Sequence, residues 1–144
     1  MKTPNQLETP GPQFEPASRQ AAPETHAPRQ TILLVEDDRS LRRYLEVVLQ
    51  KAGYTVVTAG DGLEAMKVAL TTPLNAVVTD AIMPHLGGHE LCRFLRRQSR
   101  LSHLPVILLS GLESAAPPAE DAANIYMTKP VDPHELINCL ERLL

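Results

Sequence analysis

Short apolar runs alternate with segments of helical periodicity from residue 31 onward, and this alternation limits the fold more than any other feature. Five runs are mainly apolar and have the length of strands, at 32–35, 54–59, 76–79, 105–109 and 125–128. Between them, apolar residues recur every three or four positions, for example at Leu41, Tyr44, Leu45, Val48 and Leu49. Such strands are typical of a parallel sheet with helices on both faces. We therefore predict an α/β fold, a doubly wound five-stranded parallel sheet, in a single domain at 31–144.

Residues suited to helix ends flank the helical segments. Gly53 stands where the first helix should end, and Asp61 stands where a cap of the second is expected. Asp132 precedes Pro133, which suits the first position of the last helix. Asp38 is expected in the first turn of a helix, where the dipole favours an acid.

Residues 1–30 differ from the rest of the chain. They contain no Ile, Val, Trp or Tyr, and they hold six of the 13 prolines: Pro4, Pro10, Pro12, Pro16, Pro23 and Pro28. Such a segment buries too little apolar surface to offset its ordering entropy. We predict a disordered tail or linker.

Composition excludes several classes of protein. No apolar run approaches the roughly 18 residues of a membrane span, and no signal peptide opens the chain, so we expect a cytoplasmic protein without membrane association. The net charge of −3 and the scarcity of aromatic residues argue against direct nucleic-acid binding. Cys92 and Cys139 lie in apolar helical patterns and are predicted to be buried free thiols.

Polar residues follow four of the predicted strands. Glu36, Asp37 and Asp38 follow the first strand and Asp80 the third, while Ser110 and Lys129 end the fourth and fifth. In doubly wound folds, ligands bind at the carboxyl ends of the strands. Crowded carboxylates without nearby His or Cys favour a hard cation, and a site with few protein ligands suits Mg²⁺.

The same residue types are those that phosphoryl transfer to a carboxylate requires. Asp80 is the candidate nucleophile, Lys129 would neutralise the phosphoryl oxygens, and Ser110 would donate a hydrogen bond. His85 and His89 are not expected to form a metal pair, because two glycines separate them.

At 31–144 the chain resembles the receiver domain of two-component response regulators, in the CheY-like superfamily. The matching segments are Ile32 to Asp38, Thr79 to Pro84 with Gly88, Pro105 to Ser110, and Tyr126 to Pro130. The resemblance implies the flavodoxin-like strand order 2-1-3-4-5. It also implies that Asp80 accepts a phosphoryl group from a sensor histidine kinase or phosphotransfer protein.

The resemblance further implies roles for the neighbours of Asp80. Glu36, Asp37, Asp80 and the backbone carbonyl of Ile82 would hold Mg²⁺. Lys129 would pair with the phosphoryl oxygens, preceding a peptide bond to Pro130 that is often cis in this family. Ser110 would move to bind the phosphoryl group, and Tyr126 would follow it inward as a switch.

The chain departs from the family pattern after Ser110. The segment 111–124 is about three residues shorter than usual and contains two adjacent prolines, so its helix, the family's fourth, is predicted to be short, irregular or mobile. That helix belongs to the output face, which leaves open whether the chain is a monomer or a weak dimer. Ile82 and Leu112 are apolar where polar side chains orient an attacking water, so we expect slow self-dephosphorylation.

Other functions remain as alternatives. A haloacid-dehalogenase-like phosphatase needs a second Asp where Ile82 stands, and a flavodoxin-like flavin protein needs a phosphate loop where three carboxylates stand. We therefore expect no enzyme activity beyond the chain's own phosphoryl transfer and dephosphorylation. A degenerate receiver that acts without phosphorylation, and the C-terminal receiver of a hybrid histidine kinase, remain open. No effector segment follows Leu144, so the expected output is contact with a downstream protein target.

Overall fold

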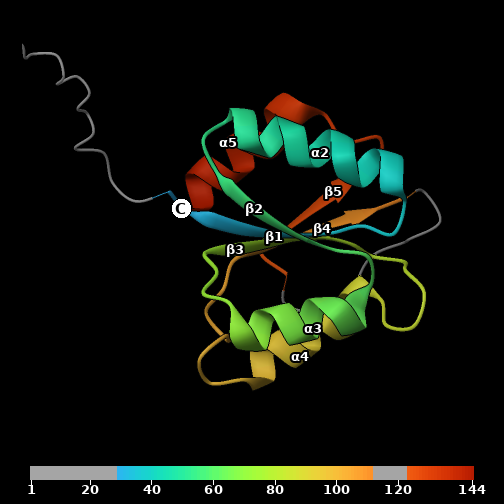
Figure 1. The fold of residues 1–144 in the computed structure, drawn as a ribbon, viewed down its shortest axis with the longest axis vertical. Coiled ribbons are helices and arrows are strands. Elements are labelled where there is room, and N and C mark those ends of the chain that lie inside the picture. The colour runs from blue at the N-terminus through green and yellow to red at the C-terminus, as the bar shows by residue number, and fades with distance from the viewer. Residues whose placement is uncertain (1–28, 112–122) are drawn as a thin grey trace, which may run out of the picture.

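The computed structural model describes residues 29–111 and 123–144 (Figure 1). Five parallel strands form one sheet in the order β2-β1-β3-β4-β5. The strands are β1 (Thr31–Val35), β2 (Thr55–Ala59), β3 (Ala76–Asp80), β4 (Val106–Ser110) and β5 (Ile125–Thr128). The helices are α2 (Arg39–Lys51), α3 (Gly62–Thr71), α4 (Gly88–Arg97) and α5 (Pro133–Leu143). The predicted doubly wound parallel sheet and its strand order are confirmed. The tail at 1–30 and the short helix predicted within 111–124 fall almost entirely outside the described residues.

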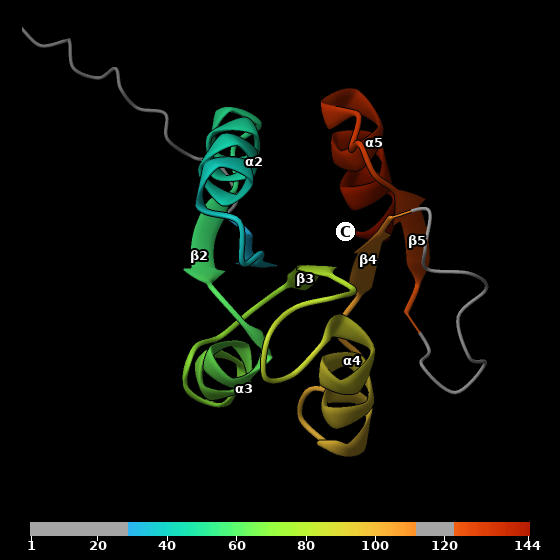
Figure 2. The ribbon, with the colours of Figure 1, turned by 90° about the vertical axis from the view of Figure 1, so that its right-hand side faces the viewer.

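Two helices cover each face of the sheet. Helices α2 and α5 pack on one face and α3 and α4 on the other, which Figure 2 shows along the sheet. Because side chains alternate along a strand, β1 supplies both cores. Ile32 and Leu34 face α2 and α5, whereas Leu33 and Val35 face α3 and α4. Each of these four side chains is fully buried.

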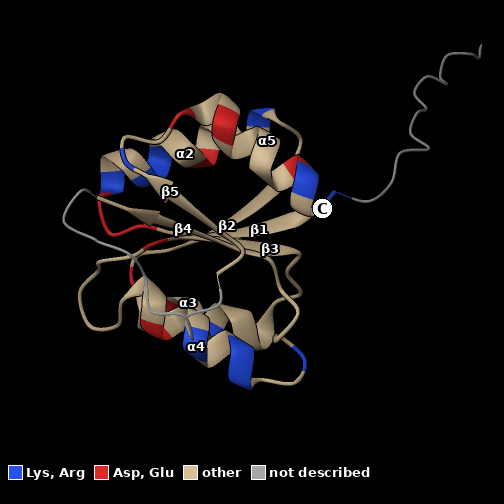
Figure 3. Cartoon of the chain, turned by 180° about the vertical axis from the view of Figure 1, so that it is seen from behind, with Lys and Arg blue, Asp and Glu red and all other residues tan. Residues whose placement is uncertain are grey.

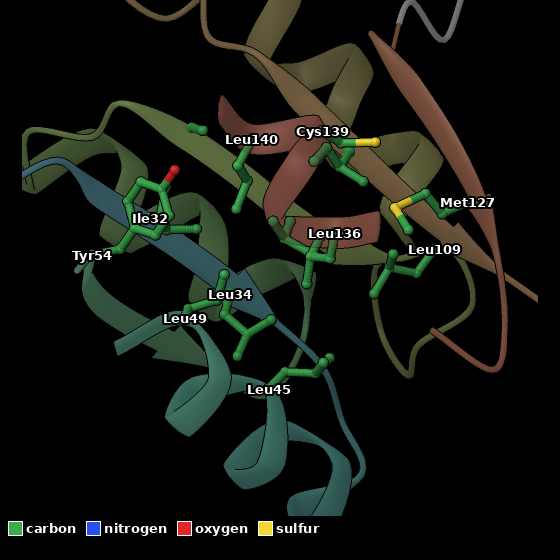
Figure 4. Packing of buried hydrophobic residues seen from close by; sticks show 13 residues of the cluster. Ile32, Leu34, Leu45, Leu49, Tyr54, Leu109, Met127, Leu136, Cys139 and Leu140 are labelled. Atoms are coloured by element: carbon green, nitrogen blue, oxygen red, sulfur yellow. The ribbon is translucent and has the colours of Figure 1, made fainter. Parts of the chain in front are cut away.

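The core beneath α2 and α5 is built from large aliphatic side chains (Figure 4). Leu45 and Leu49 of α2, Leu136 and Leu140 of α5, and Leu34 of β1 are all fully buried. Truncating one such leucine to alanine typically costs about 2–5 kcal/mol. This packing holds the strands in a fixed register, so that their carboxyl ends lie together at one end of the sheet.

The predicted caps of α3 and α5 are confirmed: the Asp61 and Asp132 side chains each accept a hydrogen bond from a backbone N–H of their helix. The prediction for Asp38 is corrected, because it lies before the first turn of α2 as its N-cap, where its side chain accepts a hydrogen bond from the Leu41 N–H. Gly53 follows α2 with a φ of 102°, which favours glycine. Cys92 and Cys139 are buried free thiols, as predicted. Within residues 29–111 and 123–144, no helix is long and apolar enough to cross a membrane.

Candidate functional site

Three carboxylates meet where β1 and β3 end. Because Val35 pairs with Thr79 in the parallel ladder, Glu36 and Asp37 emerge beside Asp80. One carboxylate oxygen from each of Glu36, Asp37 and Asp80 lies within 4.8 Å of the other two. Glu36 is only 1% exposed and Asp80 only 7%, while Asp37 faces solvent. The sheet register thus brings together residues that are far apart in the sequence.

The backbone around Glu36 is held by hydrogen bonds from three directions. The Glu36 N–H donates to the Ala59 carbonyl at the end of β2, at 3.1 Å. The Arg42 guanidinium donates to the Glu36 carbonyl at 2.8 Å, and the Asp38 N–H donates to Glu36 Oε2 at 3.1 Å. These bonds fix both the main chain and the carboxylate of Glu36.

The start of α4 lies close to the backbone of Asp80. A methyl group added at Gly88 would lie 2.2 Å from the Asp80 carbonyl oxygen, so only glycine fits there. The Gly88 N–H donates to the Ala81 carbonyl at 2.8 Å, and the Ala81 N–H donates to the Leu109 carbonyl at 2.7 Å. Asp80 is thereby held at the rim of the sheet.

Lys129 reaches the acidic residues from the end of β5. Its Nζ lies 3.0 Å from Asp80 Oδ1 and 3.3 Å from Glu36 Oε1. The Lys129 side chain is 26% exposed, so the ammonium lies at the boundary between the site and solvent. The Lys129–Pro130 peptide is cis. Two buried carboxylates therefore share one cation.

Burial dominates the electrostatics of this site. Burial raises the pKa of the Glu36 carboxyl, and the charge of Asp80 adds to the rise, while the Asp38 N–H and Lys129 oppose it. Burial also raises the pKa of Asp80, although Lys129 opposes the rise. Burial alone would lower the pKa of Lys129, but the hydrogen bond and charge of Asp80 outweigh it and the pKa rises. The site thus carries more negative charge than Lys129 offsets.

This arrangement fits a hard divalent cation. The donors are carboxylate oxygens only, and two of them are removed from water beside a single ammonium group. Oxygen donors in this number, with one side open to solvent through Asp37, suit Mg²⁺, which keeps several of its water ligands. A cation here would stabilise the ionised Glu36 carboxylate, whose pKa is raised mainly by burial and to a lesser extent by the charge of Asp80.

The remaining predicted residues lie around this site on neighbouring elements. Ser110 is the last residue of β4, and its carbonyl accepts a hydrogen bond from the Lys129 N–H at 2.8 Å. Ile82 follows β3 with an exposed side chain. Tyr126 lies in β5 opposite Leu108 and is 40% exposed.

One contact near the site was not predicted from the sequence. His85 Nδ1 lies 3.1 Å from Asp61 Oδ2, and the Gly62 N–H donates to the Leu86 carbonyl at 3.2 Å. The Glu64 N–H, and secondly His85, hold the pKa of Asp61 below its ordinary value. These contacts attach the loop after β3 to the start of α3. His85 has a φ of 70°, which is unusual for any residue other than glycine, and nothing in the local sequence predicts it.

Comparisons with known proteins agree with this geometry. A family model, the response regulator receiver domain, matches residues 32–141. The chain is 40% identical over 119 residues to a probable transcriptional regulator, ycf27, of Cyanophora paradoxa, covering 81% of this chain and 48% of that protein. The chain spans about half the length of this and other curated relatives that it matches.

Solved structures of similar proteins share the fold. The chemotaxis response regulator CheY4 of Vibrio cholerae is 31% identical with a TM-score of 0.74, and the match covers 81% of this chain and 100% of that one. The receiver domain of a sensor histidine kinase from Pseudomonas aeruginosa PAO1 is 29% identical with a TM-score of 0.75, covering 81% and 98%. That receiver domain has a magnesium ion coordinated in its active-site cleft.

Proposed function

The chain belongs to the response regulator receiver family, and from this membership we propose that it is the phosphoacceptor of a two-component phosphorelay. The observation that carries the proposal is the buried carboxylate of Asp80, 3.0 Å from the Lys129 ammonium and beside two further acids. A carboxylate nucleophile, a fixed cation and an acidic metal site are the components that phosphoryl transfer to Asp requires.

In the proposed step, an oxygen of Asp80 attacks the phosphorus of a phosphohistidine on a sensor histidine kinase or phosphotransfer protein. A P–O bond forms to Asp80 while the P–N bond breaks, and the donor imidazole leaves with the electron pair and takes up a proton. The product is an acyl phosphate. Lys129 already contacts Asp80 Oδ1 and would pair with a phosphoryl oxygen as negative charge moves onto that group.

The metal ligands in this proposal are Glu36, Asp37, Asp80 and the backbone carbonyl of Ile82. Bound Mg²⁺ would neutralise charge on the phosphoryl oxygens. The raised pKa of Glu36 supports this assignment, because it indicates a carboxylate whose charge is incompletely compensated by protein groups.

Signalling would follow from movement on the β4–β5 side of the site. Ser110 would turn to donate a hydrogen bond to a phosphoryl oxygen, and Tyr126, which is 40% exposed, would move toward the space near Ser110. The exposure of the Tyr126 side chain supports this role, because a ring that starts outside can change the surface by moving in. The output is contact with a downstream protein target rather than direct nucleic-acid or membrane binding.

We propose that the protein acts in the cytoplasm, as a monomer or weak dimer, and catalyses only its own phosphoryl transfer and slow dephosphorylation. A second setting, the C-terminal receiver of a hybrid histidine kinase, is favoured by the similarity to the receiver domain of a sensor histidine kinase. The match to the whole of CheY4 favours a separate response regulator. The mass of the native polypeptide in cell extracts distinguishes the two settings.

Incubation with acetyl phosphate and Mg²⁺ tests the proposed function. We expect the intact mass to increase by one phosphoryl group, and we expect no increase with EDTA or in Asp80→Asn. Asp38→Asn is the matched control, because it removes an adjacent exposed acid while keeping a side chain that caps α2. Absence of the adduct in folded, Mg²⁺-bound protein would favour a degenerate receiver that acts without phosphorylation.

A further inference from the structure

A groove of about 280 Å³ lies at the amino ends of the strands, at the opposite end of the sheet from Asp80. It is lined by residues 69–74, which form the end of α3 and the start of its connection to β3, and by Arg100, Leu101, His103 and Leu104 of the segment that joins α4 to β4. The Ala69, Leu101 and Leu104 side chains are nearly buried, while Leu70 is 46% exposed. The groove therefore combines an apolar floor with a partly open rim.

The two longer segments that contain the groove lining, 65–79 and 91–111, carry only positive charge. No Asp or Glu occurs in 65–79 or in 91–111, although the chain as a whole has a net charge of −3. The basic residues of these segments are Lys67, Arg93, Arg96, Arg97 and Arg100. Figure 3 shows this basic character on α4 and on the loop that follows it. These two segments are thus basic in a chain that is acidic overall.

Only some of these basic side chains are used in contacts that stabilise the end of α4. The Arg96 guanidinium donates to the Ser102 and Leu104 carbonyls at 3.2 and 2.8 Å and to Asn124 Oδ1 at 3.0 Å. These bonds close the loop after α4 and offset the partial negative charge of the helix end. Arg97 and Arg100 are exposed, and within the described part of the chain neither takes part in an ion pair.

We propose that this groove, lined by 69–74 and 100–104, is a docking site for an acidic segment of a partner protein that also carries an aliphatic side chain. Arg100 and His103 of the lining, together with Arg97 at the end of α4, would meet the carboxylates, and the floor formed by Ala69, Leu101 and Leu104 would take the aliphatic group. Charge complementarity argues for an acidic partner. The apolar floor, the absence of Phe, Tyr and Trp from the lining and the overall negative charge argue for a peptide rather than a nucleic acid.

The location makes this site independent of phosphoryl transfer. The groove lies at the amino ends of β3 and β4, and Asp80 lies at the carboxyl end of β3, about 13 Å from the start of that strand. A partner held in the groove would leave the acidic site around Asp80 open to a phosphoryl donor. The proposal therefore goes beyond the proposed function and can fail without affecting it.

An NMR titration of the nitrogen-15-labelled full chain tests the proposal. The probe is a short synthetic peptide with the repeat Glu-Glu-Leu, and the comparison peptides have the repeats Gln-Gln-Leu and Glu-Glu-Ser. We expect saturable shifts confined to 69–74 and 97–104, with at least about tenfold weaker binding for each comparison peptide. Affinity should fall several-fold as ionic strength rises from about 0.05 to about 0.5 M.

Charge reversal locates the site. Arg97→Glu with Arg100→Glu should weaken binding of the Glu-Glu-Leu peptide at least about tenfold. The matched control is Arg39→Glu with Arg43→Glu on α2, which makes the same charge change at exposed positions and should leave the affinity unchanged. Circular dichroism confirms folding of both variants.

Three results would overturn the proposal. The first is the absence of saturable shifts up to millimolar Glu-Glu-Leu peptide, and the second is an equal loss of affinity in the α2 control. The third is a stronger effect at 97–104 from duplex DNA or from anionic phosphatidylserine vesicles, which would assign the basic groove to a different class of partner.

Discussion

Lys129→Met removes the only cation that contacts both buried carboxylates of the described site. Glu36 and Asp80 are 1% and 7% exposed, and without Lys129 no described cationic side chain would form an ion pair with either carboxylate. Removing one partner from a buried ion pair costs about 3–5 kcal/mol, and the partial exposure of Lys129 places this case near 3 kcal/mol. At about 1.5 kcal/mol per molar urea, the urea midpoint at pH 7 should fall by about 2 M.

The loss should depend on pH in a defined direction. Lys129 opposes the rise in the pKa of Glu36 and Asp80, so its removal raises both pKa values further. A carboxyl whose folded-state pKa is raised binds more protons in the folded state, so its ionisation lowers stability as pH rises from the ordinary value near 4 through the raised one. The deficit of Lys129→Met relative to wild type should therefore be greatest at neutral pH and shrink as pH falls toward about 4.

Urea denaturation in EDTA at pH 7 and pH 5 measures both effects. Lys67→Met is the matched control, because it removes an exposed lysine on α3 and should change the midpoint little. A Lys129→Met midpoint within about 0.3 M of wild type at pH 7, or a loss of the same size at both pH values, would refute this electrostatic reasoning.

Three further predictions concern the carboxyl end of the sheet, and Gly53→Ala at its amino end serves as the comparison for Gly88→Ala. Without Mg²⁺ at neutral pH, Asp80→Asn should raise stability on the order of 1 kcal/mol in urea denaturation, because burial disfavours the ionised carboxylate; a loss would contradict this. Gly88→Ala should cost about 3 kcal/mol because its methyl group would meet the Asp80 carbonyl. Gly53→Ala should lower the free energy of unfolding by only about 1 kcal/mol, because the positive φ disfavours alanine but no atom lies near the added methyl group. The phosphorylated chain should lose its phosphoryl group slowly without a phosphatase, because Ile82 is apolar, and rapid loss by intact mass would exclude this.

Much of the fold could be predicted from the sequence because its signals are local. The apolar run 32–35 is long enough for a strand, and its side chains are buried on both faces of the sheet. Asp61 and Asp132 occupy helix starts, where a short acidic side chain can accept a backbone N–H. Such signals depend on neighbours in the chain and need no knowledge of tertiary contacts.

The residues that make up the candidate site could be predicted because the carboxyl ends of parallel strands lie at the same end of the sheet. The sequence placed Glu36, Asp80 and Lys129 at strand ends, and the register then determines which of them meet. The burial of Glu36 was not predictable, because it depends on how the backbone is held by Ala59 and Arg42. The sharing of one ammonium group by two carboxylates likewise appears only in three dimensions.

Contacts between loops were beyond the reach of sequence patterns. The Asp61–His85 contact joins positions 24 residues apart, and each residue has an ordinary local explanation without the other. The close approach of Gly88 to the Asp80 carbonyl depends on the angle at which α4 leaves the loop. Neither contact follows from hydrophobic periodicity, because both depend on the relative position of separate elements.

Localising the phosphoryl group tests the central claim most directly. The chain is phosphorylated with acetyl phosphate and Mg²⁺ and then treated with borohydride, which reduces an acyl phosphate to an alcohol at the modified side chain. Peptide mass spectrometry then identifies that residue. Our account predicts a homoserine at Asp80 and unmodified Asp37 and Asp38, whereas reduction at another carboxylate, or unmodified Asp80 in phosphorylated protein, would contradict it.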